Sequence, residues 1–377
     1  MITASEIRYF LQRIVRPIDP FLLAISLVIM AYAYVVMMSA SPDRINSHII
    51  NICSALVVMW IVAAQPPQRL HNFAVPLYVL GLLLLIGVAL FGDVSKGARR
   101  WLNLGVMRIQ PSELMKIAMP LMLAWYFQKR EGSLKFYDFL VATVILAIPT
   151  ALIIAQPDLG TAILVLAAGF FVIFFAGLSW KLIIPTGVLG IAAVVAIVTY
   201  QNQICAPDVK WPGLHDYQKH RVCTLLDPSS DPRGKGFHTI QSTIAVGSGG
   251  FLGKGWRMGT QTHLDFLPER HTDFILAVVS EEFGFAGVLT IAILYCLLIG
   301  RGLLIASNAA TMFGRLLAGS ITMIFFTFAF VNMGMVSGIL PVVGVPLPMI
   351  SYGGTSLVTL CLGIGILMSI QQHRRRR

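Results

Sequence analysis

Charged residues are scarce in this sequence. Asp, Glu, Lys and Arg supply 12% of the 377 residues, whereas 56% are apolar. Because a soluble domain carries about 25% charged residues, this composition excludes an ordinary water-soluble protein. The sequence also lacks a metal-binding motif, a nucleophile elbow and histidines at ligand spacing. Nothing in it indicates a dedicated metal centre or an activated serine.

Long apolar runs are what the sequence has instead. Several extend over ~20 residues without a charge, the length that crosses the ~30 Å hydrocarbon core of a bilayer as a helix. They do not alternate between apolar and polar positions, which excludes a β-barrel. We therefore predict an all-α polytopic membrane protein. Its ten expected spans are 20–40, 47–65, 74–91, 112–128, 139–155, 161–177, 182–199, 274–300, 315–339 and 354–371.

Lys and Arg in the short loops indicate how the chain crosses the membrane. With the N-terminus in the cytoplasm, the cations of the short loops and of the Arg374–Arg377 tail lie inside, and an even number of helices returns the C-terminus there. The prediction is a single domain, 1–377, with a cytoplasmic interfacial segment at 1–19 and one large periplasmic or extracellular loop at 200–273. Because four of the charges behind the net +11 belong to the tail, we assign them to a membrane surface and expect no nucleic-acid partner.

Two outer segments do not follow this charge pattern. Residues 92–111 carry four Lys and Arg residues and residues 200–273 carry eight. Long loops cross a membrane largely regardless of charge, so the larger segment needs no special reason. The shorter segment has two interpretations, which are contact with anionic lipid headgroups and an outward-facing site for an anionic substrate.

The first candidate for chemistry follows Arg108. Pro111 and Ser112 suit the start of a helix, where Ser can cap backbone donors. Glu113 and Lys116 are then i,i+3 on one helix face, where their side chains can meet. Ionisable residues at membrane depth are costly and are functional candidates. The alternatives are a structural ion pair, or a lysine that extends to the headgroups.

The second candidate is Asp273, which lies where the large outer loop enters the eighth span. It can act as a general base in a partly desolvated cleft. The alternative is a first-turn carboxylate that faces the helix dipole. Ser280 falls nearly on the Asp273 face of that helix, and Glu282 falls on the opposite face.

Three further outer elements are irregular. The glycine-rich segment 247–256 can present backbone amides to a pyrophosphate, or be a flexible turn. Residues 341–356 are apolar without helical pattern, as expected of backbone that lines a cavity. Residues 156–160 contribute one acid, Asp158. In an oxidising compartment, Cys205 and Cys223 can pair, and two free thiols are the alternative.

The order of these motifs resembles the SEDS family (shape, elongation, division and sporulation) over essentially the whole chain. The segment ending at Asp273 is more similar to the elongation branch than to the division branch. Segment 203–215 departs from the family pattern, which leaves its local structure open. The matching segments are Lys96–Trp101, Gln110–Glu113, Gln156–Thr161, Ala245–Gly250, His271–Phe274 and Ser351–Gly354.

The resemblance implies a peptidoglycan glycosyltransferase in the bacterial inner membrane, with its active site on the outer face. It implies that lipid II is polymerised into β-1,4-linked glycan strands with inversion during cell elongation, releasing undecaprenyl pyrophosphate. Asp273 matches the acid regarded as catalytic in the family. We expect substrate to be bound by Arg108, Glu113, Lys116, Asp158, Lys254, Arg270 and Ser351.

The resemblance also implies partners and cofactors. Expected partners are a class B penicillin-binding protein, other elongation-complex membrane proteins and membrane lipid. No cofactor is expected to be stably bound, although a divalent cation, Mg or Mn, can help neutralise a pyrophosphate. A lipid II flippase is the main rival, because intramembrane Glu113 and Lys116 would suit a translocation path, but the inverted repeats typical of transporters are not visible. A non-catalytic scaffold is the third interpretation.

Overall fold

The computed structural model describes residues 17–95, 98–103, 108–206, 209, 216–227, 235–264, 266–267 and 269–374. Most of the interfacial segment predicted at 1–19 lies outside these residues. The helices are α2 (Pro20–Ala40), η1 (Pro42–Arg44), α3 (Ile45–Ala63), α4 (Pro67–Phe91), α5 (Pro111–Lys129), α6 (Phe136–Ala155), α7 (Leu159–Phe175), α8 (Trp180–Thr199), α9 (Gln201–Ile204), α10 (Asp216–Leu226), α11 (Lys235–Ser248), α12 (Thr260–His263), α13 (Ile275–Ser307), α14 (Met312–Val336) and α15 (Gly354–Gln372). A small antiparallel sheet has the order β1 (Asp93–Ser95), β2 (Ala98–Asn103) and β3 (Arg108–Ile109).

The predicted polytopic helical fold is confirmed. Each expected span coincides with a helix, namely α2 to α8 and α13 to α15. Within the described residues, eight helical stretches are long and apolar enough to cross a membrane. α7 has 17 residues and is shorter than the rest. α5 contains Glu113, Lys116 and Lys129, and it is not among the eight.

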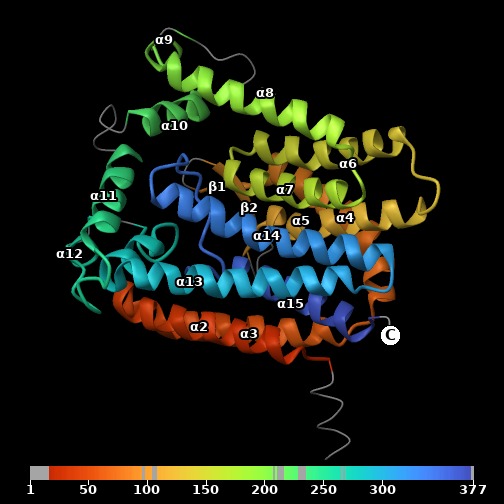
Figure 1. Ribbon diagram of the computed structural model, residues 1–377, viewed down its shortest axis with the longest axis horizontal. Helices are drawn as coiled ribbons and strands as arrows, with labels where there is room; N and C mark the ends of the chain where they lie inside the picture. The colour runs from red at the N-terminus through yellow and green to blue at the C-terminus, as the bar shows by residue number, and fades with distance from the viewer. Residues whose placement is uncertain are drawn as a thin grey trace, which may run out of the picture.

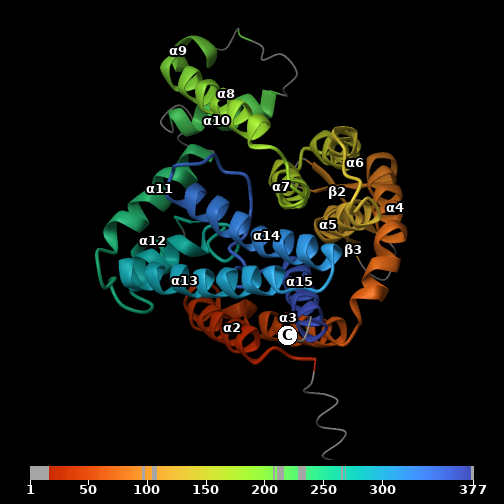
Figure 2. The ribbon, with the colours of Figure 1, turned by 45° about the vertical axis from the view of Figure 1, so that its right-hand side comes forward.

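Consecutive long helices run in opposite directions, so their connections gather at two ends of the bundle. At the loop end, α2, α4, α6, α8 and α14 finish and α3, α5, α7, α13 and α15 begin. This end also carries the sheet, α9 to α12 and the segment 337–353. At the short-loop end, the connections are brief. α5 lies inside the bundle against α4, α7 and α14, while α13 packs between α2 and α14 (Figures 1 and 2).

Helix starts are fixed locally. Proline stands in the first turn of α2, α4 and α5, where its missing N–H costs no helical hydrogen bond. Asp19 caps α2, since its Oδ1 accepts from the backbone N–H of Leu22 at 2.9 Å. The prediction that Ser112 caps α5 is wrong. Gln110 occupies the cap position of α5 and no side chain caps it, because Ser112 already lies inside the first turn.

α8 differs from the other long helices because none of its residues is buried. It stands away from the bundle in both views (Figures 1 and 2). A Cβ added at Gly187 or Gly190 would meet no atom within 4 Å. The position of α8 therefore depends on the segments that precede and follow it.

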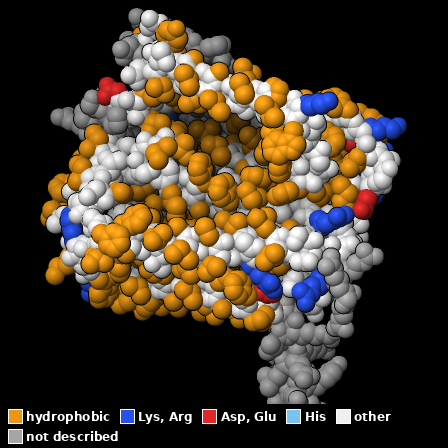
Figure 3. All heavy atoms as spheres, viewed as in Figure 1, with side chains coloured by type: hydrophobic (Ala, Val, Ile, Leu, Met, Phe, Trp, Pro, Cys, Tyr) orange, Lys and Arg blue, Asp and Glu red, His pale blue; other side chains and the backbone are white. Residues whose placement is uncertain are grey.

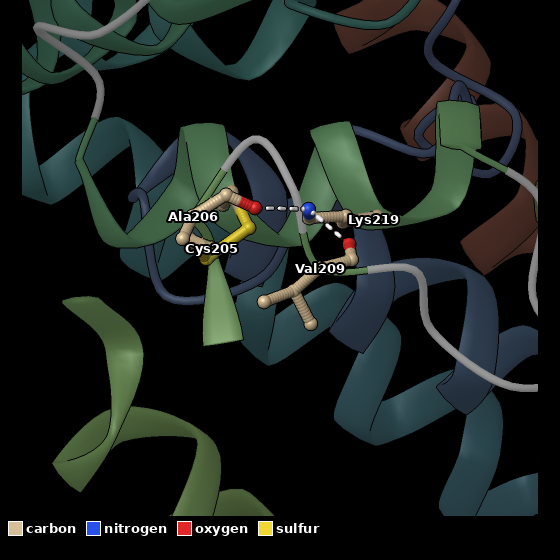
Figure 4. Close-up of a disulfide and its surroundings, with 5 residues drawn as sticks. Cys205, Ala206, Val209 and Lys219 are labelled. Carbon is tan, nitrogen blue, oxygen red and sulfur yellow. Dashed lines mark hydrogen bonds between the residues drawn. A yellow bond between two sulfur atoms is a disulfide. The ribbon is translucent and has the colours of Figure 1, made fainter. Parts of the chain in front are cut away.

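The segment after α8 is held by a disulfide. Cys205 and Cys223 are bonded, which confirms the pairing that the sequence left open and joins α9 to α10. Lys219 strengthens the junction, since its Nζ donates to the carbonyl oxygens of Ala206 and Val209, each at 2.6 Å (Figure 4). α10 in turn packs on α11, so this junction connects α8 to the rest of the loop end.

Thiol labelling tests the disulfide. We expect denatured, unreduced protein to label at three cysteines, Cys53, Cys296 and Cys361, and reduced protein to label at all five. The matched control is Cys223→Ser, which should release the Cys205 thiol and label at four positions without reduction. Five labelled cysteines in the unreduced wild type would contradict the bond.

Candidate functional site

The segment 337–353 is the centre of the loop end. It has no regular secondary structure, yet Val345, Leu347 and Ile350 are almost completely buried. Asn332 on α14 anchors it, because its Nδ2 donates to the carbonyl oxygens of Val345 and Asp273, each at 2.8 Å. The segment is therefore irregular backbone buried among the helices, and the expectation that it lines a cavity stays a prediction.

Asp273 lies directly beside this segment. Gly344 has a φ of +76°, and a Cβ added there would lie 3.4 Å from Oδ2 of Asp273. The Asp273 residue is partly exposed. Its carboxylate therefore sits against a glycine whose positive φ disfavours any other residue, while a Cβ there would make only an ordinary van der Waals contact with the carboxylate.

Ser351 fastens the same segment to the residues before Asp273. Its Oγ donates to the carbonyl oxygen of Thr272 at 2.6 Å and accepts from the N–H of Leu347 at 2.8 Å. The N–H of Tyr352 donates to the carbonyl oxygen of His271 at 2.8 Å. Ser351 thus has a structural role, and its contact with substrate stays a prediction.

Asp158 joins three elements at the loop end. It caps α7 through Thr161, and its Oδ2 accepts from Nε2 of Gln110 at 3.0 Å. Arg100 on β2 lies 3.9 Å from its Oδ1 and donates to the carbonyl oxygen of Pro157. A Cβ added at Gly160 would approach the carbonyl oxygen of Val343 to 2.7 Å. Asp158 therefore lies two residues from a close contact with segment 337–353, and Asp273 lies beside the same segment. The two acids stand before different helices, α7 and α13.

The pairing of Glu113 with Lys116 is confirmed. The Nζ of Lys116 lies 2.6 Å from Oε1 of Glu113. The exposed fractions of the two side chains are 2% for Lys116 and 13% for Glu113. The ammonium also lies 4.8 Å from the ring centroid of Phe328 on α14. Oε2 of Glu113 is buried and has no hydrogen-bond partner within the described part of the chain, so the pair has acceptor capacity left for a ligand.

Two predicted substrate-binding cations are bound to the protein itself. Nζ of Lys254 lies 2.7 Å from Oε1 of Glu281, a fully buried carboxylate on α13. Arg270 donates from Nε to the carbonyl oxygen of Ala40 at 2.7 Å, and from Nη1 to that of Thr262 at 2.8 Å. The Arg270 contacts hold the segment before Asp273 against α2 and α12, and the Lys254 contact holds the glycine-rich segment against α13. The remaining predicted cation, Arg108, is in β3, and its side chain is outside what the structure describes.

The glycine-rich segment 247–256 does not form a cradle for pyrophosphate. The amides of Lys254 and Gly255 donate to the carbonyl oxygens of Glu281 and Glu282, at 2.9 and 3.0 Å. α13 is kinked at Gly284, where φ is +65°. A Cβ added at Gly284 would lie 2.3 Å from the amide nitrogen of Gly253. The glycines therefore let the segment pack closely on the kink.

Sequence reasoning missed the surroundings of Tyr352. Its ring lies 6.1 Å from that of His48 on α3 and 6.0 Å from that of His271, with the Arg44 guanidinium 5.4 Å from its centroid. His48 is 1% exposed, and neither ring nitrogen has a hydrogen-bond partner among the described residues. The available signal was an ionisable residue inside an apolar span.

No cluster of three or more His, Cys, Asp or Glu residues that could hold a metal ion occurs in the described ranges. What the described residues place at the loop end is a partly exposed carboxylate beside an anchored backbone, a buried ion pair at the start of α5 and an acid that caps α7. Such a set can accept a proton and orient a polar substrate.

Comparison with known proteins gives consistent results. The family model for FtsW, RodA and SpoVE, described as cell cycle protein, matches residues 17–376. The peptidoglycan glycosyltransferase MrdB of Escherichia coli (strain K12) is 50% identical over 361 residues, covering 95% of this chain and 94% of that protein. The probable peptidoglycan glycosyltransferase FtsW of Geobacter sp. (strain M18) is 38% identical over 308 residues, or 81% of this chain and 80% of its own.

Solved structures also resemble this chain in fold. The rod shape determining protein RodA of Thermus thermophilus superposes with a TM-score of 0.68 at 26% identity, covering 95% of this chain and 98% of that one. A chain from a structure on the coordination of polymerization and crosslinking by a peptidoglycan synthase complex gives a TM-score of 0.78 at 32% identity. It covers 95% of this chain and 99% of its own.

A double-mutant cycle tests the buried pair. We expect Glu113→Gln and Lys116→Met each to lower the free energy of unfolding by about 3–5 kcal/mol, because each leaves one buried charge without its partner. The double variant should lose less than the sum of the two. The measurement is unfolding of the purified protein in detergent. The matched control is the exposed pair of Arg315 and Glu131, whose loss should cost under ~1 kcal/mol. Strictly additive losses for Glu113 and Lys116 would contradict the pairing.

Proposed function

The chain belongs to the FtsW, RodA and SpoVE family of cell cycle proteins, and on that basis we propose that it is a peptidoglycan glycosyltransferase of cell elongation. The observation that carries this is 50% identity, over 95% of the chain, to a protein named as that enzyme. The position of Asp273 beside the buried segment 337–353 supplies a carboxylate suited to the reaction.

The proposed substrate is lipid II, a sugar carried on undecaprenyl pyrophosphate. An acceptor hydroxyl oxygen attacks the anomeric carbon of the donor sugar and forms a β-1,4 glycosidic bond with inversion. The bond from that carbon to the pyrophosphate oxygen breaks, and its electron pair leaves with undecaprenyl pyrophosphate. The hydroxyl proton passes to Asp273, which acts as the general base.

The fold supports positioning by backbone and buried charge. Asn332 and Ser351 fix the backbone on either side of the Asp273 carboxylate, so the base does not need to be ordered when substrate arrives. Negative charge grows on the pyrophosphate as it leaves, and a cation there stabilises the transition state more than the ground state. The ion pair of Glu113 and Lys116 is the proposed organiser of that region, with Arg108 as a further cation.

The lipid tail needs an apolar groove. The surface is hollowed between α8 and the bundle, and hydrophobic side chains surround the hollow (Figure 3). Because α8 has no buried residue, space beside it is open to lipid. We assign the polyprenyl chain to this hollow.

The orientation follows from the cations of the short-loop end. Arg69, Lys129, Arg130, Lys181 and Arg315 all lie in or beside its brief connections, and such loops stay in the cytoplasm. The loop end, with Asp273, then faces outward from the bacterial inner membrane. A class B penicillin-binding protein is the proposed partner, which agrees with the likeness to a chain of a peptidoglycan synthase complex.

Asp273→Asn tests the assignment of the base. The variant keeps the shape of the side chain and removes its basicity, so glycan synthesis from lipid II by the purified protein should fall below detection while expression and thermal stability persist. The assay measures glycan chain length with and without a class B penicillin-binding protein. The matched control is Asp43→Asn, an exposed acid at the same end of the bundle, which should retain activity. Near wild-type synthesis by Asp273→Asn would refute the role.

A further inference from the structure

A cavity of about 280 Å³ lies at the short-loop end, at the far end of the helices from Asp273. It is bounded by the first turns of α4 and α14 and the last turns of α5 and α15. We call it the His71 cavity. Its polar lining includes Gln68, His71, Gln128, Thr311 and His373. None of its described lining residues is Asp or Glu.

Two imidazoles line this cavity. His71 packs against two aromatic rings. Its ring centroid lies 5.3 Å from that of Phe313 and 6.4 Å from that of Trp125. Nδ1 of His373 lies 2.9 Å from the carbonyl oxygen of Ser369. That hydrogen bond places a proton on Nδ1 and leaves Nε2 for a ligand.

Backbone donors converge on the same space. α4 and α14 both begin here. The first N–H groups of α14 have no carbonyl partner within that helix, whereas α4 begins at Pro67 after the cap residue Pro66, neither of which has an N–H, and the N–H of Arg69 donates to the carbonyl oxygen of Pro66. The Oγ1 of Thr311 accepts from the N–H of Gly314 at 3.1 Å, so its own hydroxyl hydrogen remains available. The side-chain oxygen of Gln128 is buried and has no partner within the described residues. A ligand that offers several acceptor oxygens and one hydroxyl would satisfy all of these groups.

We propose that the His71 cavity binds a phosphate group, carried either by an anionic lipid headgroup or by a soluble phosphate. The positive ends of two long helices point at it, two imidazoles face it and no carboxylate opposes it. Lys129 adds charge nearby, with its ammonium 4.2 Å above the Trp125 ring that contacts His71. The volume suits a small headgroup rather than a larger ligand. The site is independent of the proposed glycosyl transfer, because it lies at the other end of the bundle.

The test uses full-length purified protein and two probes. One arm follows thermal unfolding in detergent against inorganic phosphate, with chloride at matched ionic strength. The other arm counts phosphatidylglycerol retained per chain from mixed micelles with phosphatidylcholine, by native mass spectrometry. The variants are the double His71→Gln/His373→Gln, which removes the imidazoles, and Ala310→Phe, which fills the cavity from an exposed position. Lys181→Gln is the control, a cation at the same end outside the cavity.

We expect the wild type to bind at least one probe, and both variants to bind it about tenfold more weakly, which is about 1.4 kcal/mol. Retention of phosphatidylglycerol alone identifies a lipid headgroup, stabilisation by inorganic phosphate alone identifies a soluble ligand, and either supports the site. Equal binding by the wild type and both variants, or an equal loss in Lys181→Gln, would overturn it, since the probes would then respond to surface charge. Absence of binding to both probes in the wild type would overturn it as well.

Discussion

Irregular backbone buried in an apolar bundle must find partners for its N–H and C=O groups, and the loop end depends on how residues 337–353 meet this requirement. The side-chain amide of Asn332 donates a hydrogen bond to the carbonyl oxygen of Val345 and another to that of Asp273. Ser351 and Tyr352 then bond the two residues that precede Asp273. The backbone that carries the carboxylate is consequently held by α14 and by the segment before α15, in addition to the turn in which Glu269 accepts from the N–H groups of Thr272 and Phe274.

Buried charge follows a similar logic. Removing a carboxylate from water is costly unless donors surround it, and Glu281 receives donors from Lys254, Thr260 and the N–H of Gln261. The sequence assigns Arg270 and Lys254 to substrate binding. In the structure, both side chains donate hydrogen bonds to the protein itself. Their charge still contributes to the field at the loop end. Their immediate effect is to hold the segment before Asp273 on α2 and α12, and the glycine-rich segment on α13.

The sequence predicts the helices well because each span is an unbroken apolar run, and it predicts the contact of Glu113 with Lys116 because i,i+3 spacing alone brings them together. The Cys205–Cys223 bond was foreseeable as one of two outcomes. The kink at Gly284 was not foreseeable, since it exists only where a glycine-rich segment from far away in the chain packs on it. The hydrogen bond of Arg270 was not foreseeable either, because its acceptor, the carbonyl oxygen of Ala40, is 230 residues away in the sequence. Nor was the environment of His48, which packs beside Tyr352.

α8 has no buried residue. In a membrane it would therefore be surrounded by lipid, and not by protein, on nearly every side. A 20-residue helix is about 30 Å long, which matches the hydrocarbon thickness of an average bilayer. A thinner membrane would tilt such a helix at a cost of only fractions of a kcal/mol per Å of mismatch, and no packed neighbour resists the rotation. Its far end is fastened through the disulfide to α10 and α11, so the tilt is passed to the loop end. The width of the hollow beside α8 is in this way coupled to the composition of the membrane around it.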